Sequence, residues 1–217
     1  LRTATAQPPE PTLFVIGPRL DPGVHACDSF LHRNQIPYER LDPDDPAAVA
    51  QAGGGAVVAG PYPVVARRDG TRLTAPTMRT VATVAGLTVQ PGQTLYDVVI
   101  VGGGPAGLTA AVNGASEGLQ TALIESFAPG GQAGTSTRIE NYTGFPFGVS
   151  GDELASRALQ QARRLGADIV VTRRIEGIDP VERTVRLDGG DVLRTRSIIL
   201  ATGVEWRRLG IDSVDQY

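Results

Sequence analysis

Near its middle, the chain contains a short apolar strand that leads directly into a cluster of glycines. Residues 97–101 read Asp-Val-Val-Ile-Val, and residues 102–107 read Gly-Gly-Gly-Pro-Ala-Gly. The alanine-rich residues 105–118 carry apolar side chains at helical spacing, which predicts a helix. A strand, a G-x-G-x-x-G turn and a helix in this order are typical of the first half of a dinucleotide-binding βαβ unit.

The second strand of this unit is predicted at residues 121–124, and Glu125 follows it, 18 residues beyond Gly107. We expect the Glu125 carboxylate to accept hydrogen bonds from ribose hydroxyls and to repel a 2′-phosphate, which favours FAD or NAD over NADP. The alternative is that the glycines form an ordinary βα turn and that Glu125 is a solvated residue at a strand end.

Each residue of the turn has an expected physical role. Gly102 permits the tight turn, Gly104 lets the backbone approach a pyrophosphate, and Gly107 lets the helix pack on the strand. Pro105 and Ala106 begin the helix, whose N-terminus offers N–H groups and about half a positive elementary charge. We predict that these five residues form a cofactor-binding turn, with the phosphates of a dinucleotide at Gly104 and the helix N-terminus.

Composition excludes several classes of function. The 217 residues are 41% hydrophobic and 20% charged, as in globular proteins large enough for two domains. A net charge of −3 gives no basic patch for nucleic acid, and no apolar run approaches the roughly 20 residues of a membrane helix. The single cysteine, Cys27, excludes an internal disulfide, a zinc-binding cysteine cluster and a CxxC pair, so we expect a cytoplasmic protein.

The predicted domain organisation has three parts. Residues 1–11 are interpreted as a linker, residues 12–92 as a small α/β domain, and residues 93–217 as the dinucleotide-binding domain. The turn-forming run Gln90-Pro91-Gly92-Gln93 marks the boundary between the two domains.

In the first domain, strands are predicted at residues 13–16, 38–41, 64–67 and 71–73, and helices at residues 24–33, 46–51 and 77–85. This β-α-β-α-β-β-α order resembles the thioredoxin/glutaredoxin fold. Pro63 stands where that family carries a cis-proline, and Asp21-Pro22-Gly23-Val24 stands where its two redox cysteines belong. Both cysteines are missing. Cys27 lies further along the predicted helix and is interpreted as a core residue rather than a nucleophile. His25 and His32 have no third ligand nearby, so we predict no metal site and no catalytic residue in this domain.

Residues 126–150 form a segment that is too long for an ordinary connection and is rich in glycine and threonine. Together with the glycine turn it resembles the low-molecular-weight thioredoxin reductase family of FAD-dependent pyridine nucleotide oxidoreductases. The resemblance covers residues 96–217, and its further motifs are Gly130-Gly131-Gln132, Ile139-Glu140-Asn141-Tyr142 with Gly144-Phe145-Pro146, and Ala201-Thr202-Gly203.

The resemblance implies an α/β fold: a thioredoxin-like N-terminal domain followed by the first part of a Rossmann-type FAD-binding domain, a three-layer ββα arrangement with a β-meander. It also implies roles near the flavin. Gly131 brings backbone close to FAD, Gln132 and Asn141 bond near the isoalloxazine, and residues 201–203 pass close to the cofactor. The full set of predicted cofactor-binding residues is Gly102, Gly104, Pro105, Ala106, Gly107, Glu125, Ser126, Gly131, Gln132, Asn141, Ala201, Thr202 and Gly203.

The activity that the resemblance implies is transfer of electrons from NAD(P)H through FAD to a disulfide or another acceptor, in a possible homodimer. The family's nicotinamide domain, with its second GxGxxG and its CxxC, has no counterpart in the 217 residues. We therefore expect this stretch to be the front part of such an enzyme and inactive alone. Two alternatives stay open: a thioredoxin-like binding module beside an incomplete nucleotide-binding domain, and an NAD-dependent dehydrogenase. Trp206, just beyond the Ala-Thr-Gly motif, is interpreted as a packing residue.

Overall fold

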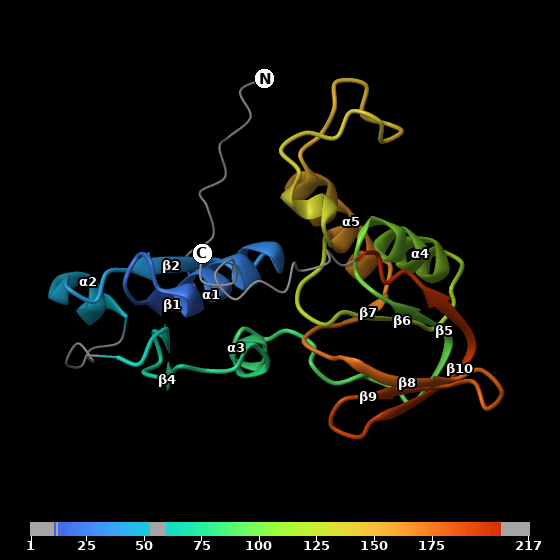
Figure 1. Ribbon diagram of the computed structural model, residues 1–217, viewed down its shortest axis with the longest axis horizontal. Helices are drawn as coiled ribbons and strands as arrows, with labels where there is room; N and C mark the ends of the chain where they lie inside the picture. Colours follow the sequence, from blue (N-terminus) through green and yellow to red (C-terminus); the bar gives the residue numbers. More distant parts are fainter. Residues whose placement is uncertain (1–10, 12, 53–59, 205–217) are drawn as a thin grey trace, which may run out of the picture.

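A computed structural model describes residues 11, 13–52 and 60–204 of the chain. The predictions on residues 1–10 of the linker and on Trp206 lie outside the described residues. The described residues form two units, each built on its own sheet (Figure 1). Within those residues, every helix is too short or too polar to cross a membrane.

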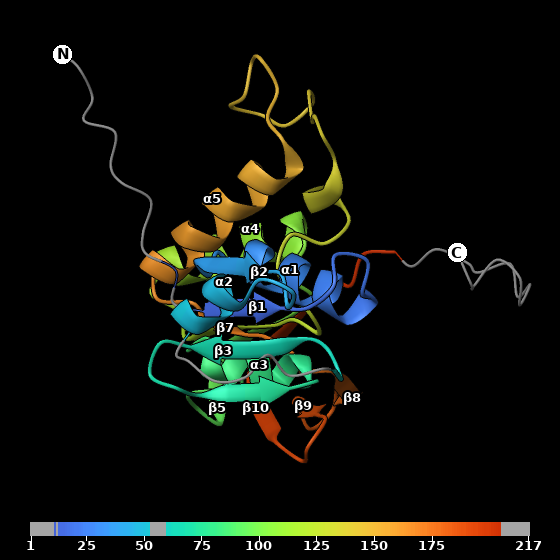
Figure 2. The same cartoon turned by 90° about the vertical axis from the view of Figure 1, so that its left-hand side faces the viewer.

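The first unit is a four-stranded sheet with helices on both faces, and Figure 2 views it directly. Its strand order is β2-β1-β3-β4; β1 and β2 are parallel, whereas β3 is antiparallel to β1 and β4 is antiparallel to β3. Its elements are β1 (Leu13–Ile16), α1 (Pro22–Arg33), β2 (Tyr38–Leu41), α2 (Pro46–Gln51), β3 (Val64–Arg67), β4 (Arg72–Thr74) and α3 (Met78–Val84). This is the order of elements that the sequence predicts.

Strand β1 is buried on both faces because side chains alternate across a strand. Leu13 and Val15 pack in the core cluster that α1 and α3 share, and Phe14 and Ile16 pack in the cluster on the α2 side. The central position of β1 therefore explains its uninterrupted apolar sequence. The Tyr62–Pro63 peptide bond before β3 is cis, as the family resemblance implied.

The second unit is a six-stranded sheet with the order β7-β6-β5-β10-β9-β8. Strands β5, β6, β7 and β10 are parallel, and β8, β9 and the first part of β10 form an antiparallel meander. Its elements are β5 (Leu95–Val101), α4 (Pro105–Ser116), β6 (Thr121–Ile124), the 3-10 helix η1 (Ala133–Thr135), α5 (Gly151–Arg164), β7 (Asp168–Val170), β8 (Ile175–Asp179), β9 (Thr184–Leu187) and β10 (Val192–Leu200).

The second unit has three layers. Helices α4 and α5 cover one face of the parallel strands, and the meander covers the other (Figure 1). A core cluster that includes Val99 and Ile124 from the parallel strands and Val185 and Leu187 from β9 fills the space between the two β layers. The expected α/β fold with a parallel nucleotide-binding sheet is thus confirmed.

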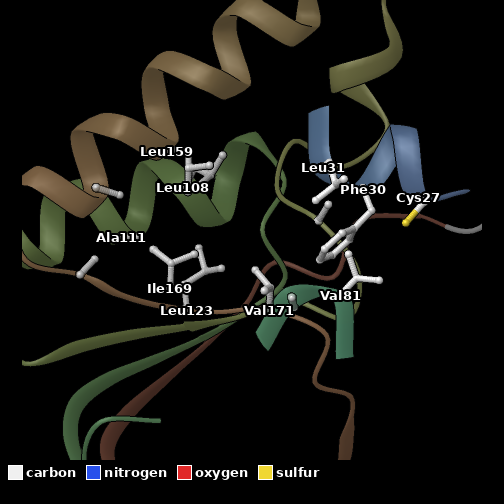
Figure 3. Packing of buried hydrophobic residues seen from close by; sticks show 14 of the residues in the cluster. Cys27, Phe30, Leu31, Val81, Leu108, Ala111, Leu123, Leu159, Ile169 and Val171 are labelled. Atoms are coloured by element: carbon white, nitrogen blue, oxygen red, sulfur yellow. The ribbon is translucent and has the colours of Figure 1, made fainter. Parts of the chain in front are cut away.

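The two units share one hydrophobic core. Phe30 of α1 and Val81 of α3 belong to the same buried cluster as Leu108 of α4 and Val171, which follows β7 (Figure 3). The Phe30 and Phe127 rings meet edge to face, with 5.4 Å between their centroids. Because apolar surface of both units is buried at this contact, the first unit is fixed against the second.

The segment that joins the units is also anchored. The Asp168 carboxylate accepts hydrogen bonds from the Tyr96 hydroxyl at 2.5 Å and from the Gly92 N–H at 2.8 Å. Burial, followed by the bond to Asp168 and its charge, raises the pKa of Tyr96. The segment at the predicted boundary, residues 90–93, is therefore an anchored turn rather than a flexible linker.

Candidate cofactor-binding cleft

A cleft of about 1310 Å³ opens where the carboxyl ends of β5, β6 and β10 face the N-terminus of α4. Ligands of open α/β sheets bind at this edge. The cleft is lined by Arg33, Val101, Gly102, Gly103, Gly104, Pro105, Ala106, Ile124, Glu125, Ser126, Gly131, Gln132, Ala133, Thr135, Ser136, Arg173, Arg174, Ile175, Ala201, Thr202, Gly203 and Val204.

The structure brings together eleven of the thirteen residues predicted to bind a cofactor. These are Gly102, Gly104, Pro105, Ala106, Glu125, Ser126, Gly131, Gln132, Ala201, Thr202 and Gly203. They come from four separate segments of the sequence, and the parallel sheet places the ends of those segments at one edge. The two others, Gly107 and Asn141, do not line the cleft.

Gly107 lies behind the cleft, where it packs α4 against the glycine turn. A Cβ at position 107 would stand 1.9 Å from the carbonyl oxygen of Gly102. No side chain fits in that space, so Gly107 is a packing residue that lets α4 begin at the end of β5. This is the packing role that the sequence suggested for it, without direct contact to a ligand.

Gly102 permits two features of the site at once. Its φ of +104° lies in the left-handed region that favours glycine. A Cβ there would also stand 2.4 Å from the carbonyl oxygen of Ala201. The glycine therefore lets the chain that leaves β10 pass against the turn, which brings Thr202 and Gly203 into the cleft.

Gly104 marks the open part of the turn. It is the N-cap of α4, and the nearest atom to an added Cβ would be the Gly131 Cα at 3.9 Å. Because Pro105 has no N–H, the first N–H groups that α4 presents belong to Ala106 and Gly107. A phosphate can approach this helix end closely, and the positive end of the helix dipole favours its charge.

Residues 128–131, here called the Gly-Gly loop, lie against the glycine turn, and Gly131 lines the cleft. The Gly130 N–H donates to the Gly103 carbonyl at 2.8 Å, and φ is +110° at Gly130 and +55° at Gly131. A Cβ at position 131 would stand 3.0 Å from the Cα of Gly104. Both glycines are thus required for the loop to approach the turn.

Glu125 stands at the end of β6, where the sequence predicted an acidic residue. Its carboxylate accepts hydrogen bonds from the N–H of Gly103 at 2.7 Å and from the N–H of Phe127 at 2.9 Å. Each oxygen keeps further acceptor capacity for a ribose hydroxyl. Glu125 therefore also ties the glycine turn to the segment after β6, a role that the sequence did not predict.

Arg33 is a lining residue that sequence reasoning missed, since it comes from α1 of the first unit. Its guanidinium donates to the carbonyls of Ala128 at 2.9 Å, Pro129 at 3.2 Å and Gly131 at 3.3 Å. Burial lowers the pKa of Arg33, and the charges of Glu125 and Asp152 oppose that effect. No local sequence signal could have placed this arginine in a site about 100 residues away.

Arg173 and Arg174 also line the cleft beyond Glu125. Arg173 is 3% exposed and binds Asp188 through Nε at 2.9 Å and Asp191 through Nη2 at 2.5 Å. Burial acts to lower the pKa of Arg173, but the bonds and charges of Asp191 and Asp188 outweigh it and raise the pKa. Arg173 is thus held by two carboxylates, as a structural residue beneath the cleft.

Asn141 is not brought to the cleft. It is exposed and lies in the segment between η1 and α5, which extends beyond the helical layer and away from the sheet (Figure 1). The segment is held by its own contacts, such as the bridge between Ile139 and Val149. The sequence motif did not determine where this segment would lie. Gln132, in contrast, lines the cleft, and its amide donates to the Val204 carbonyl.

Cys27 and the two histidines do not contribute to this site. Cys27 is fully buried in the shared core, which confirms its assignment as a core residue. Burial, with a smaller effect of Asp28, raises the pKa of the Cys27 thiol to about 12, so that it is protonated at neutral pH. His32 pairs with Asp152 at 3.2 Å on the surface. Among the described residues, no group of three or more His, Cys, Asp or Glu side chains could hold a metal ion.

The lining fits the FAD that the sequence resemblance implies. The cleft is larger than the roughly 300–1,000 Å³ of most small-molecule sites, as an extended dinucleotide requires. One end offers the helix N-terminus and the side-chain-free surface of Gly104, and the Glu125 carboxylate lies next to it. Phosphate donors beside a ribose acceptor are the pair of groups that an adenosine diphosphate moiety needs.

Comparisons with known proteins agree with this geometry. Thioredoxin reductase of Bacillus subtilis is 38% identical over 117 residues, which cover 54% of this chain and 37% of the relative. Thioredoxin reductase of Mycolicibacterium smegmatis is 40% identical over 124 residues, which cover 55% of this chain and 38% of the relative. The crystal structure of T. acidophilum thioredoxin reductase aligns with a TM-score of 0.50 and 30% identity, over 55% of this chain and 39% of that one.

The chain thus spans less than two fifths of the length of each of these relatives. The family described as pyridine nucleotide-disulphide oxidoreductase matches residues 96–217, which make up more than half of the chain and contain all but one of the residues that line the cleft. The chain belongs to the pyridine nucleotide-disulphide oxidoreductase family.

Proposed function

We propose that the chain is the FAD-binding part of a flavoprotein oxidoreductase that passes electrons from NAD(P)H to a disulfide or another acceptor. The observation that carries the proposal is the convergence of Gly104, Glu125 and Thr202 on one cleft at the carboxyl edge of the parallel sheet. Membership of the family implies FAD as the cofactor, and NADPH is expected for the family.

Each part of the cleft has a role in holding the cofactor. The N-terminus of α4 and Gly104 receive the pyrophosphate, and Glu125 accepts hydrogen bonds from the ribose. Gly131 of the Gly-Gly loop and Gln132 also line the cleft, where Gly131 presents backbone without a side chain. When bound, FAD supplies the chemistry, because its ring takes up a hydride and passes two electrons onward.

The electron acceptor depends on residues outside this stretch. Reduction of a disulfide by thiol exchange requires a thiolate, and the only cysteine of the 217 residues is buried and protonated. We propose that the thiols, and the nicotinamide-binding domain, come from another part of the protein. We further propose a homodimer located in the cytoplasm, by analogy with the family and from the low cysteine content.

The test is to purify the chain and record its visible absorption spectrum after incubation with FAD and removal of excess ligand. The bands of a bound oxidised flavin are expected in one-to-one proportion to protein. A protein that folds, as judged by circular dichroism, and retains no flavin would contradict the proposal.

A matched variant makes this test specific. In Gly104→Ala the nearest neighbour of the new methyl group is 3.9 Å away, so the fold is retained. The methyl group nevertheless occupies space that a pyrophosphate needs against the backbone. We expect Gly104→Ala to bind FAD at least about tenfold more weakly, equivalent to about 1.4 kcal/mol. Gly134→Ala, where the added Cβ meets nothing within 4 Å, serves as the control.

A second candidate function concerns the first unit, which we propose is a thioredoxin-like domain that binds rather than reduces. The residues that occupy the positions of the missing redox cysteines, Asp21 and Val24, have structural roles here. The Asp21 side chain caps α1 by accepting the Val24 N–H at 2.9 Å, and the Val24 side chain is fully buried. A cap and a core residue at these positions favour a docking or scaffolding role over electron transfer.

The double variant Asp21→Cys with Val24→Cys tests the thioredoxin-like assignment. If the backbone at these positions matches that fold, the two thiols will form an intramolecular disulfide, detected as a loss of two hydrogen masses that dithiothreitol reverses. Failure to form the disulfide in a folded protein would refute the assignment. The single variant Asp21→Cys is the control, since the other thiol of this variant, Cys27, is fully buried in the core.

A further inference from the structure

The wall of the cleft is supported by an arginine that belongs to the other unit. Arg33 is the last residue of α1. Its Nε and Nη2 atoms donate to three carbonyls of the Gly-Gly loop, those of Ala128, Pro129 and Gly131. Two of the three residues whose carbonyls accept these bonds, Ala128 and Pro129, are buried, and Gly131 is partly buried, so water has limited access to replace the bonds. A planar guanidinium with several donors in fixed directions suits such a set of carbonyls.

The Gly-Gly loop needs an external support because its own conformation is unusual. Gly130 and Gly131 both have positive φ, and glycine in such turns loses much conformational freedom on ordering. The loop also approaches the glycine turn closely, through the bond between the Gly130 N–H and the Gly103 carbonyl. Movement of the loop by even a small distance would therefore change the cleft beside Gly104.

Helix α1 is placed for this task by contacts on both sides of Arg33. The Phe127 ring, just before the loop, packs against Phe30 and lies under the Arg33 guanidinium at 5.8 Å. His32 pairs with Asp152 at the start of α5, and the Gln160 amide donates to Gln35 at 2.9 Å. The end of α1 is thus held against the loop and against α5.

The position of Arg33 also gives it an electrostatic effect. Its charge lies on the cleft lining together with the N-terminus of α4, and both favour an anionic ligand. Burial lowers the pKa of Arg33, and the charge of Glu125, which also lines the cleft, partly offsets that effect. The guanidinium therefore remains charged in its half-buried position.

We propose that Arg33 is a positioning residue for the cofactor, which holds the Gly-Gly loop in its binding conformation from the first unit. The first unit is then an integral wall of the cleft rather than an independent appendage. The part of the proposal that concerns FAD rests on the proposed function, whereas the support of the loop does not.

The test compares full-length chains of wild type, Arg33→Gln, Arg33→Lys and the control Arg79→Gln by amide hydrogen exchange in nitrogen-15 NMR, without cofactor. Arg79 also joins the two units, but its bonds are to Thr172 and Asp188, which are not part of the loop. In Arg33→Gln, the amides of Gly130 and Gly134 are expected to exchange at least about tenfold faster, while Arg79→Gln leaves them within about twofold of wild type. Equal protection of Gly130 in wild type and Arg33→Gln would overturn the proposal.

The Arg33→Lys variant separates the effect of the guanidinium geometry from the effect of its charge. It also provides the test if Arg33→Gln fails to fold. Lysine keeps the charge, but its ammonium group cannot donate to three carbonyls in the directions that the planar guanidinium provides. The faster amide exchange is therefore expected to persist. Full protection in Arg33→Lys would show that charge alone supports the loop and would overturn the positioning role.

The second readout is FAD affinity, measured by quenching of FAD fluorescence. Arg33→Gln is expected to bind FAD about tenfold more weakly than wild type and Arg79→Gln. Unchanged affinity despite faster loop exchange would refute the role in cofactor positioning. If wild type itself binds no FAD, the proposed function fails, and the exchange experiment still decides whether Arg33 holds the loop.

Discussion

The Glu125 carboxylate accepts the backbone N–H of Gly103 at 2.7 Å, across 22 residues of sequence. This bond joins the glycine turn after β5 to the end of β6. The residue that the sequence assigned to ribose binding therefore also fixes the turn that we propose receives the pyrophosphate. If both assignments hold, recognition of the ribose and of the phosphates is coupled through one side chain.

The coupling predicts a large effect of Glu125→Ala on cofactor binding. The variant removes the ribose acceptor and leaves the Gly103 N–H without its partner. We expect FAD affinity to fall by about 1.5–3 kcal/mol, roughly 10- to 150-fold, in a fluorescence titration. Glu117→Ala, at the far end of α4, is the matched control and is expected to bind FAD as wild type does. Equal affinities in all three proteins would remove Glu125 from the site.

Gly107→Ala is expected to destabilise the second unit, because its Cβ would collide with the backbone carbonyl of Gly102 at 1.9 Å. Neither partner is a flexible side chain, so the helix must shift away from the strand. We expect a loss of about 1–3 kcal/mol in the free energy of unfolding, measured with urea. Gly134→Ala, which meets open space, should stay within about 0.5 kcal/mol of wild type. A Gly107→Ala variant as stable as Gly134→Ala would contradict the packing role.

Asp188→Asn is expected to weaken the contact between the units. The Asp188 carboxylate accepts bonds from buried Arg173 at 2.9 Å and from Arg79 of α3 at 2.5 Å. Loss of these charge-assisted bonds should lower the free energy of unfolding by about 1.5–3 kcal/mol at pH 7. Glu153→Gln, which breaks an exposed pair with Arg157, should cost no more than about 0.5 kcal/mol.

The ionisation of the Asp188 carboxylate predicts that the free energy of unfolding depends on pH. Burial acts to raise the pKa of Asp188, but the bonds from Arg173 and Arg79 outweigh it and hold the pKa below its ordinary value of 3.8. The stabilisation is therefore present above pH 3.8 and is lost as the pH falls through the lower pKa of the folded state. The difference in unfolding free energy between wild type and Asp188→Asn should shrink in that acidic range. A difference that stays constant with pH would exclude an ionised Asp188 as its source.

The burial of the Cys27 thiol predicts that the protein loses stability at alkaline pH. Burial raises the pKa of its thiol from 9.0 to about 12, so the folded state keeps a proton that the unfolded state releases. The contribution of the protonated thiol to the free energy of unfolding is fully present below pH 9. Above pH 9 this contribution decreases by about 1.4 kcal/mol per pH unit. Urea unfolding from pH 8 to 10.5 should show this decrease in wild type relative to Cys27→Ala. Parallel pH profiles for the two proteins would indicate that the thiol is not buried.

Local structure was largely predictable because its signals are local. The predicted strands at residues 13–16, 38–41 and 64–67 match β1, β2 and β3. For β1 and β3 the signal is a short, mainly apolar run bounded by turn residues. The α1 helix begins two residues earlier than predicted because Asp21 caps it and Pro22 is its first residue. The glycine turn, its helix and the acidic residue after β6 all lie where the motif predicted.

The site itself was only partly predictable. The four cofactor motifs line one cleft because parallel strands bring their carboxyl ends to one edge, which the order of the elements already implies. Asn141 departs from this because it lies in a long segment whose position depends on packing contacts rather than on a strand end. Arg33 was missed because nothing in the sequence around it indicates a partner 95 residues further along the chain.

The sequence by itself determined the elements, the glycine turn and the acidic residue that together indicate a dinucleotide-binding unit. Those features depend on backbone freedom at glycine, on helix and strand periodicity, and on spacing within about 30 residues. Only the tertiary structure decided that Glu125 holds the turn and that Arg33 of the first unit supports the Gly-Gly loop. The reason is physical: the first contact joins atoms 22 residues apart that meet only when the second unit folds, and the second joins atoms 95 residues apart that meet only when the two units bury their shared core.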